Sequence, residues 1–220
     1  MACLALMACT STVKAQVTRA EAHCGLIGSY CDRLTPCKDE QASLRYVRPG
    51  IDSKQYSKVI IAPVTYWGSE EAKISATDRQ DLINYFQETL RDEFGKKFQL
   101  VDKPGPGVMT VIVALTYADS ATPVLRSISM IVPQARVLSS GAYQVTGHFP
   151  FVGSTQVEAK AEDSDIGQVL AAMVDKRLGG GSPNAGFQWQ WVDVERAMHY
   201  WAESKTNLLD AWTSGREKAE

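Results

Sequence analysis

The sequence predicts an α/β domain of two layers, in which two main helices cover a mixed sheet of about five strands. A β-branched run at residues 58–67 is followed by a segment at 77–95 whose apolar residues recur every fourth position, so a strand precedes an amphipathic helix. Further apolar or alternating runs at 108–116 and 151–162 indicate strands, and a second helical periodicity closes the chain at 189–214. Strands and helices in this order favour one layer of each kind.

The composition is that of a globular protein. The chain has 220 residues, of which 45% are hydrophobic and 22% are charged. A formal net charge of -2, with scattered basic residues, argues against nucleic acid as a partner, because such proteins carry a basic face. We expect a lipoprotein signal remnant at residues 1–8, a cysteine-containing tether at 9–44, a single α/β domain at 45–214 and a tail at 215–220.

Residues Leu6-Met7-Ala8-Cys9 resemble a bacterial lipobox, in which the cysteine becomes the lipidated first residue of the mature protein. The residues before Cys9 carry no Lys or Arg, although a signal peptide normally begins with basic residues. We therefore interpret Met1 as an internal methionine of a longer signal. The alternative is an apolar cytosolic terminus. Thr10, rather than Asp, follows Cys9 and resembles the outer-membrane sorting pattern, so we expect an outer-membrane lipoprotein that faces the periplasm and is held by lipid on Cys9.

Three cysteines lie inside the predicted tether, at Cys24, Cys31 and Cys37. In an oxidising compartment they allow one disulfide in any of three pairings. The alternative is a zinc site with His23 as the fourth ligand. Adjacent His23 and Cys24 can rarely face one tetrahedral ion, and the cysteine spacings are wider than is usual for zinc. We expect a disulfide, no metal site and no cofactor.

The first strand and the first helix of the domain have distinct local signals. Pro63 lies within the run at 58–67 and cannot donate to a sheet, so we place it at an edge or a bulge. Thr77 is predicted to cap the helix, with Gln80 completing a capping box and Asp78 near the positive end of the helix dipole. The helix should bury a stripe formed by Leu82, Ile83, Phe86, Leu90 and Phe94.

The second half of the chain alternates strands with irregular segments. The run at 108–116 is apolar at both its odd and its even positions, which predicts a central strand that is buried on both faces. Residues 119–150 are apolar but interrupted by prolines. We expect them to form a buried crossover, and the alternative is an exposed patch for a partner or the membrane surface. The alternating run at 151–162 predicts a half-exposed antiparallel strand that returns through a hairpin at 163–167.

Several of these segments together resemble a family of proteobacterial lipoproteins that is catalogued as a domain of unknown function. The resemblance implies an envelope lipoprotein with no assigned activity, and it covers roughly residues 45 to 205. The cysteine-containing segment lies outside this pattern. The matching segments are Tyr46-Val47-Arg48-Pro49-Gly50, Lys58 to Val64, Val101 to Gly107, the hairpin from Gly153 to Gly167, and Ala197 to Ala202.

Signals for catalysis are weak. A Gly-x-Ser-x-Gly nucleophile motif is absent from the sequence, and the glycine-rich loop at 179–186 lacks the Lys-Ser or Lys-Thr pair of a phosphate-binding loop. His199 follows an apolar position of the last helix, where a packed or surface histidine is commoner than a catalytic one. His148 lies in a predicted loop and is the better candidate for a base. We expect that the protein is not an enzyme.

Three tryptophans are the candidate binding residues. Trp67 ends the first strand, and Trp189 and Trp191 open the last helix, so the three rings could meet at one edge of the sheet. There they would stack on a glycan or anchor a protein partner, or else fill the end of the core. The expected function is a non-catalytic, lipid-anchored module that binds or scaffolds another envelope protein. The alternatives are a module for a small ligand or glycan and, third, a hydrolase-like enzyme.

Overall fold

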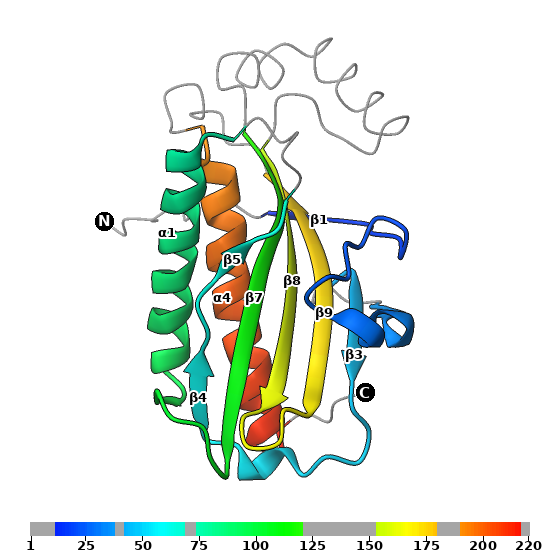
Figure 1. The fold of residues 1–220 in the computed structure, drawn as a ribbon, viewed down its shortest axis with the longest axis vertical. Coiled ribbons are helices and arrows are strands. Elements are labelled where there is room, and N and C mark those ends of the chain that lie inside the picture. The colour runs from blue at the N-terminus through cyan, green and yellow to red at the C-terminus, as the bar shows by residue number, and fades with distance from the viewer. Residues whose placement is uncertain (1–11, 38–41, 69–73, 121–152, 180–189, 217–220) are drawn as a thin grey trace, which may run out of the picture.

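A computed structural model describes residues 12–37, 42–68, 74–120, 153–179 and 190–216. In this part of the chain, nine strands form one mixed sheet. Two long helices, α1 (Ala76–Gly95) and α4 (Val192–Thr213), lie side by side on one face of the sheet (Figure 1). We call this the inner face. The opposite, outer face is partly covered by residues 12–37, which we call the N-terminal segment (Figure 1).

The sheet has the order β2-β3-β9-β8-β7-β4-β6, with β1 paired to β9 and β5 paired to β7. The pairs of β4 with β6, β4 with β7 and β5 with β7 are parallel, and the remaining pairs are antiparallel. The strands are β1 (Val13–Ala15), β2 (Thr35–Pro36), β3 (Leu44–Val47), β4 (Lys58–Ile61), β5 (Thr65–Tyr66), β6 (Gln99–Leu100), β7 (Val108–Asp119), β8 (Ser154–Asp163) and β9 (Val169–Leu178). Two short 3-10 helices, η1 (Gly28–Arg33) and η2 (Ser53–Gln55), complete the described elements.

The α/β class and the mixed sheet are confirmed, but the predicted number of about five strands is wrong. The long strands β7, β8 and β9 had clear patterns. The strands that were not predicted, β1, β2 and β3, are two to four residues long, and a period of two cannot be recognised over so few positions. The predicted strand at 58–67 is likewise divided into β4 and β5. Pro63 lies between them, where it has no amide hydrogen to offer the sheet.

The N-cap of helix α1 lies two residues before the predicted one. Ser75 is the N-cap, and its hydroxyl accepts a hydrogen bond of 3.0 Å from the Asp78 amide. The hydroxyl also donates to the Asp78 carboxylate at 2.9 Å. The prediction of Thr77 as the cap is therefore wrong, because Ser75 and Asp78 form a similar reciprocal pair two residues upstream. The predicted apolar stripe is confirmed: Leu82, Phe86, Leu90 and Phe94 are buried and Ile83 is partly buried.

The N-terminal segment differs from the tether predicted for residues 9–44. Val17, Ile27 and Leu34 are buried against the outer face, where they form a small second core with residues of β3 and β9. This cover also corrects the expectation that β8 is half-exposed. Gln156 and Glu158 lie on its outer face and are buried, because sequence alternation identifies a polar face without identifying what covers it.

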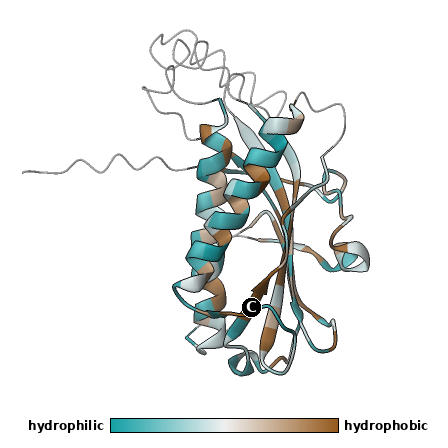
Figure 2. Ribbon diagram, turned by 60° about the vertical axis from the view of Figure 1, so that its left-hand side comes forward, coloured by the Kyte–Doolittle hydropathy of each residue, from teal (hydrophilic) through white to brown (hydrophobic). Residues whose placement is uncertain are grey.

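The helices present their apolar sides to the larger core, which lies between them and the inner face. Figure 2 shows mainly hydrophilic residues over the outward sides of both helices. Within the described ranges, none of the helices combines the length and hydropathy needed to cross a membrane. The predicted crossover at 119–150 falls almost entirely, with His148, outside the described residues. Of the glycine-rich loop at 179–186, only Gly179 belongs to the described residues.

The hairpin between β8 and β9 is tied to the rest of the domain through Asp163. Its carboxylate accepts a hydrogen bond of 2.7 Å from the Tyr56 hydroxyl and two from the amides of Asp165 and Ile166, at 2.9 and 3.2 Å. Burial raises the pKa of Asp163, but the hydrogen bonds from Tyr56 and from the two amides outweigh burial, so the pKa lies below its usual value. The ionised form is therefore the one that stabilises the fold.

Replacing Tyr56 with Phe is expected to lower the free energy of unfolding by roughly 1.5–3 kcal/mol near neutral pH, the usual range for a hydrogen bond to a charged group. A carboxyl with a lowered pKa stabilises the fold above its unfolded pKa of about 3.9, and this contribution is lost as the pH falls through the folded value. The difference in the free energy of unfolding between the wild type and Tyr56→Phe should thus become smaller at acidic pH. Urea unfolding across the acidic range tests this. An equal cost of Tyr56→Phe in an Asp163→Asn background would contradict the pairing.

Candidate ligand-binding pocket

A cavity of about 260 Å³ lies between α4 and the inner face of the sheet. Side chains of β7, β8 and β9 form its floor, and α1 contributes Phe86, Leu90 and Phe94 to one wall. The other wall is α4, from Trp201 to Trp212. Apart from three basic residues, the lining is apolar.

The cavity exists because small side chains oppose large ones. β8 and β9 present Ala159, Ala161 and Ala171 toward the helices, and these small side chains leave the space between the sheet and the helices unfilled. Trp201 and Trp212 are eleven positions apart, which is close to three turns, so both rings project toward the sheet and hold α4 away from it. Because protein interiors are normally close-packed, a void of this size between two layers is a candidate binding site.

The polar residues of the lining are all basic. Among the described residues that line the cavity, Arg45, Lys160 and Lys205 carry positive charge and none is an aspartate or glutamate. Arg45 lies opposite Met173 in the register of β3 and β9, and therefore on the inner face. Lys205 is on α4, one turn after Trp201. The Lys160 side chain lies on the outer face, as that of Glu158 does, and it forms an ion pair of 2.7 Å with Glu162 there, so Arg45 and Lys205 are the two cations that face the pocket. The pocket thus favours an anionic group on an apolar ligand.

A buried polar network fixes the end of the pocket at Trp201. One carboxylate oxygen of Asp175 accepts a hydrogen bond of 2.7 Å from the Trp201 indole and one of 2.8 Å from Arg177. The other oxygen accepts a bond of 3.0 Å from the Ser43 hydroxyl. The Arg177 guanidinium also lies 4.1 Å from the centre of the Tyr200 ring. These contacts join β9 to α4 and hold the Trp201 wall in place.

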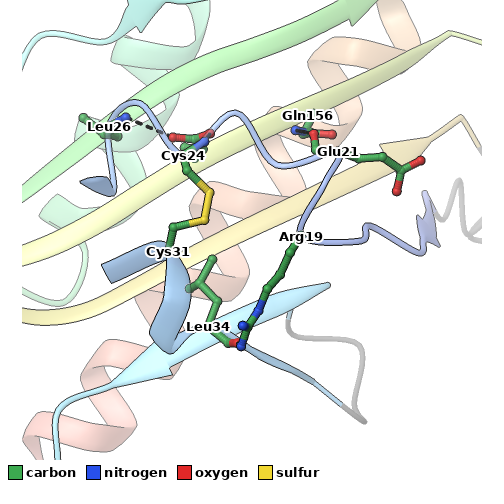
Figure 3. Close-up of a disulfide and its surroundings, with 8 residues drawn as sticks. Arg19, Glu21, Cys24, Leu26, Cys31, Leu34 and Gln156 are labelled. Carbon is green, nitrogen blue, oxygen red and sulfur yellow. Dashed lines mark hydrogen bonds between the residues drawn. A yellow bond between two sulfur atoms is a disulfide. The ribbon is translucent and has the colours of Figure 1, made fainter. Parts of the chain in front are cut away.

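On the outer face, a disulfide and a buried carboxylate hold the N-terminal segment. Of the three possible pairings, the structure joins Cys24 to Cys31 (Figure 3). Cys37 is not part of this disulfide. Glu158 of β8 is 0% exposed, and it accepts hydrogen bonds from the amides of Cys24 and Leu26 at 2.5 and 3.1 Å. The loop closed by the disulfide is therefore attached to the middle of the sheet.

Two further contacts extend this attachment along the N-terminal segment. The Gln156 side chain donates to the Glu21 carbonyl at 3.3 Å, and the Arg19 guanidinium donates to the Leu34 carbonyl at 2.5 Å (Figure 3). The first contact binds the segment to β8, and the second joins two parts of the segment to each other. The N-terminal segment is consequently a folded cover of the outer face.

The candidate tryptophans do not share one exposed edge. Trp67 is 44% exposed and packs on Gly25, where an added Cβ would lie 2.6 Å from the ring. Trp191 is 2% exposed and belongs to the core on the helix side of the sheet. Trp189 lies outside the described residues. Trp67 and Trp191 are therefore on opposite faces of the sheet, and Trp191 offers no surface to a ligand.

The remaining candidates do not form a site in the described ranges. His199 is 55% exposed, and its Nε2 lies 4.0 Å from a carboxylate oxygen of Glu93 on the helix surface. Within the part of the chain that the structure describes, no cluster of three or more His, Cys, Asp or Glu residues is arranged to bind a metal. The apolar pocket was missed by sequence reasoning. Its signals were the inward alanines of β8 and β9 and the spacing of Trp201 and Trp212, which become meaningful only once the strand register is known.

Fold and site together define an α/β domain that has an apolar pocket under its helices and a disulfide-closed cover on its outer face. The chain belongs to the family described as "Protein of unknown function (DUF3313)", whose model matches residues 23–204. This confirms the predicted family of unknown function. It also places part of the cysteine-containing segment inside the family's domain.

Relatives in Escherichia coli are lipoproteins by name. The chain is 25% identical over 148 residues to the uncharacterized lipoprotein YdcL of strain K12 and, equally, to that of O157:H7. The match covers 66% of this chain and 64% of each relative, so the chain spans somewhat less than two thirds of their length. The predicted resemblance to lipoproteins is thereby confirmed.

Among solved structures, the similarity is distant. Protein XCC0632 of Xanthomonas campestris, from the family DUF330, matches with a TM-score of 0.42 and 8% identity over 78% of this chain and 94% of that one. A PelC dodecamer from Paraburkholderia phytofirmans matches with a TM-score of 0.38 and 10% identity over 73% and 95%.

Proposed function

We propose that this protein is a lipid-anchored, non-catalytic envelope protein that binds an apolar ligand between α4 and the sheet. The pocket of about 260 Å³ is the observation that supports binding. The lipoprotein relatives support a lipid anchor, for which Cys9 is the candidate. Thr10, the residue after Cys9, is the feature that favours the outer membrane, with the domain on its periplasmic side. Of the functions expected from the sequence, the small-ligand module is now favoured over a scaffold for another envelope protein.

The size and lining of the pocket fit a small apolar ligand. Ligand pockets usually measure about 300–1,000 Å³, so this one lies just below the lower end of that range. An apolar cavity of about 150 Å³ is already known to take benzene. Val47, Met173 and Leu209 line the cavity and are only partly buried, so solvent reaches it and a ligand can enter. Covering these side chains would remove their apolar surface from water.

A neutral hydrophobic dye, N-phenylnaphthylamine, tests the pocket without involving charge. We expect saturable binding to the wild type, measured by the rise in dye fluorescence. Ala161→Phe fills the floor of the pocket and should weaken binding by roughly tenfold or more, which corresponds to about 1.4 kcal/mol. Ala171→Leu is a second, smaller filling variant in case Ala161→Phe does not fold.

Ala76→Phe is the matched control, because Ala76 is exposed at the start of α1, outside the pocket lining. It should bind the dye as the wild type does. Equal binding by all the variants, or no binding by the wild type, would refute the proposed site. The anchor is tested separately by metabolic labelling with a palmitate analogue. Equal labelling of the wild type and Cys9→Ser would refute it.

A further inference from the structure

We infer that the ligand of this pocket is a fatty acid with a single alkyl chain of about twelve carbons, with this chain in the apolar cavity and its carboxylate at Arg45 and Lys205. The inference rests on the proposed function of the pocket as a binding site. It adds the chemical class of the ligand. Three properties of the lining carry it: the sign of its charge, the lack of partners for a polar ligand body, and the small volume.

The charge of the lining selects the head group. Its ionisable residues are Arg45, Lys160 and Lys205, with no carboxylate among the described lining residues. Lys160 alternates with the inward Ala159 and Ala161, so its side chain lies on the outer face, where it pairs with Glu162 at 2.7 Å, and its charge does not face the ligand. Arg45 and Lys205 are partly buried, and they approach the pocket from β3 and from α4. A guanidinium and an ammonium so placed suit a carboxylate, which an arginine binds through two parallel hydrogen bonds.

The body of the ligand must be apolar. Beyond Arg45 and Lys205, the cavity continues between the inward alanines of β8 and β9 and the aromatic rings of α1 and α4. A glycan would lose its hydrogen bonds to water there without replacement, at a high cost in free energy. A flexible alkyl chain loses nothing of this kind and gains from leaving water. This argues against the glycan alternative for this site.

The volume limits the ligand to one chain. At about 260 Å³, the cavity is smaller than the usual pocket for a drug-sized molecule. A two-chain phospholipid would need substantially more apolar space than the described residues enclose. Leu208 and Leu209 follow Lys205 at i+3 and i+4 and therefore lie on the same side of α4. An extended chain whose head group lies at Lys205 would run along these side chains toward Trp212.

Ligands that share one chain and differ only in the head group test this inference. Dodecanoate, dodecanol and dodecyltrimethylammonium would compete with the neutral dye at about pH 8, where the carboxylate is ionised. We expect dodecanoate to bind roughly tenfold more tightly than dodecanol and the ammonium compound to bind most weakly. Lauroyl lysophosphatidate forms a further arm. Tighter binding of this phosphate than of dodecanoate would overturn the assignment to a fatty acid.

The double variant Arg45→Gln/Lys205→Gln should remove the preference for dodecanoate and leave the dissociation constant of dodecanol unchanged. Lys103→Gln is the matched control, since Lys103 is exposed and does not line the pocket. Equal affinities for dodecanoate and dodecanol in the wild type would overturn this inference, although binding of the dye would still uphold the pocket. Failure of the wild type to bind the dye would overturn the proposed function itself and this inference with it.

Discussion

Replacing Asp175 with Ala is expected to lower the free energy of unfolding by about 3–5 kcal/mol, the cost of removing one partner of a buried ion pair. Arg177 is 1% exposed, so in the variant its charge stays buried after losing the carboxylate at 2.8 Å. The Trp201 indole and the Ser43 hydroxyl lose the same acceptor. Because Trp201 lines the pocket, dye binding should weaken as well. Urea denaturation followed by tryptophan fluorescence measures the loss of stability.

The exposed Asp92 on α1 provides the control for this substitution. Asp92→Ala should change stability by no more than about 0.5 kcal/mol, as is usual for surface positions. Asp175→Asn keeps one acceptor oxygen and should fall between the wild type and Asp175→Ala. A loss of less than about 1 kcal/mol in Asp175→Ala would show that the network does not hold α4 on the sheet.

Replacing Glu158 with Ala is expected to release the loop closed by the disulfide from the sheet. The carboxylate is fully buried and accepts two amide hydrogen bonds, each worth roughly 1.5–3 kcal/mol to a charged acceptor. The variant loses both hydrogen bonds, but water partly replaces Glu158 as the acceptor for the amides of Cys24 and Leu26. We therefore expect a loss of about 3 kcal/mol in the free energy of unfolding, at the lower end of the sum for two such bonds. Hydrogen exchange at these two amides should become much faster.

Glu162 offers a matched control on the same strand and the same face of β8. It forms an ion pair of 2.7 Å with Lys160 near the surface, and such pairs contribute about 0–1 kcal/mol. Glu162→Ala should therefore leave hydrogen exchange at Cys24 and Leu26 unchanged. If Glu158→Ala also left the exchange of both amides unchanged, Glu158 would not be what holds the N-terminal segment.

Long periodic patterns were the most informative part of the sequence. The apolar stripe of α1 and the apolar run of β7 predicted one helix and one central strand correctly, because both patterns extend over nine or more residues. Local signals located elements less well. The N-cap is Ser75 and not Thr77, because both positions carry a hydroxyl residue with a polar residue three positions later.

The cover of the outer face was not predictable from local patterns. The apolar residues at 12–37 recur with no period, yet Val17, Ile27 and Leu34 are buried against strands that lie far along the chain. Glu158 looked like a surface residue because its partners are backbone amides 132 and 134 positions away. Every residue except proline has a backbone amide that can donate a hydrogen bond, so the residue types at positions 24 and 26 do not indicate that their amides bind Glu158.

The pocket has a similar origin. An alanine in a strand usually indicates only a small side chain, and nothing in the sequence states that Ala161 lies beside Ala171. The register of β8 and β9 brings the two together, and α4 adds the tryptophans that keep the layers apart. A cavity is a property of opposed surfaces, so it appears only once both are in place.

The most direct test of the central claim is a crystal structure of the protein with ω-bromododecanoate, in which anomalous scattering locates the bromine. We predict one bromine peak inside the pocket near Trp212 and the carboxylate between Arg45 and Lys205. Bromine peaks found only outside the pocket, or an empty pocket in crystals grown at a ligand concentration that saturates binding in solution, would contradict the account.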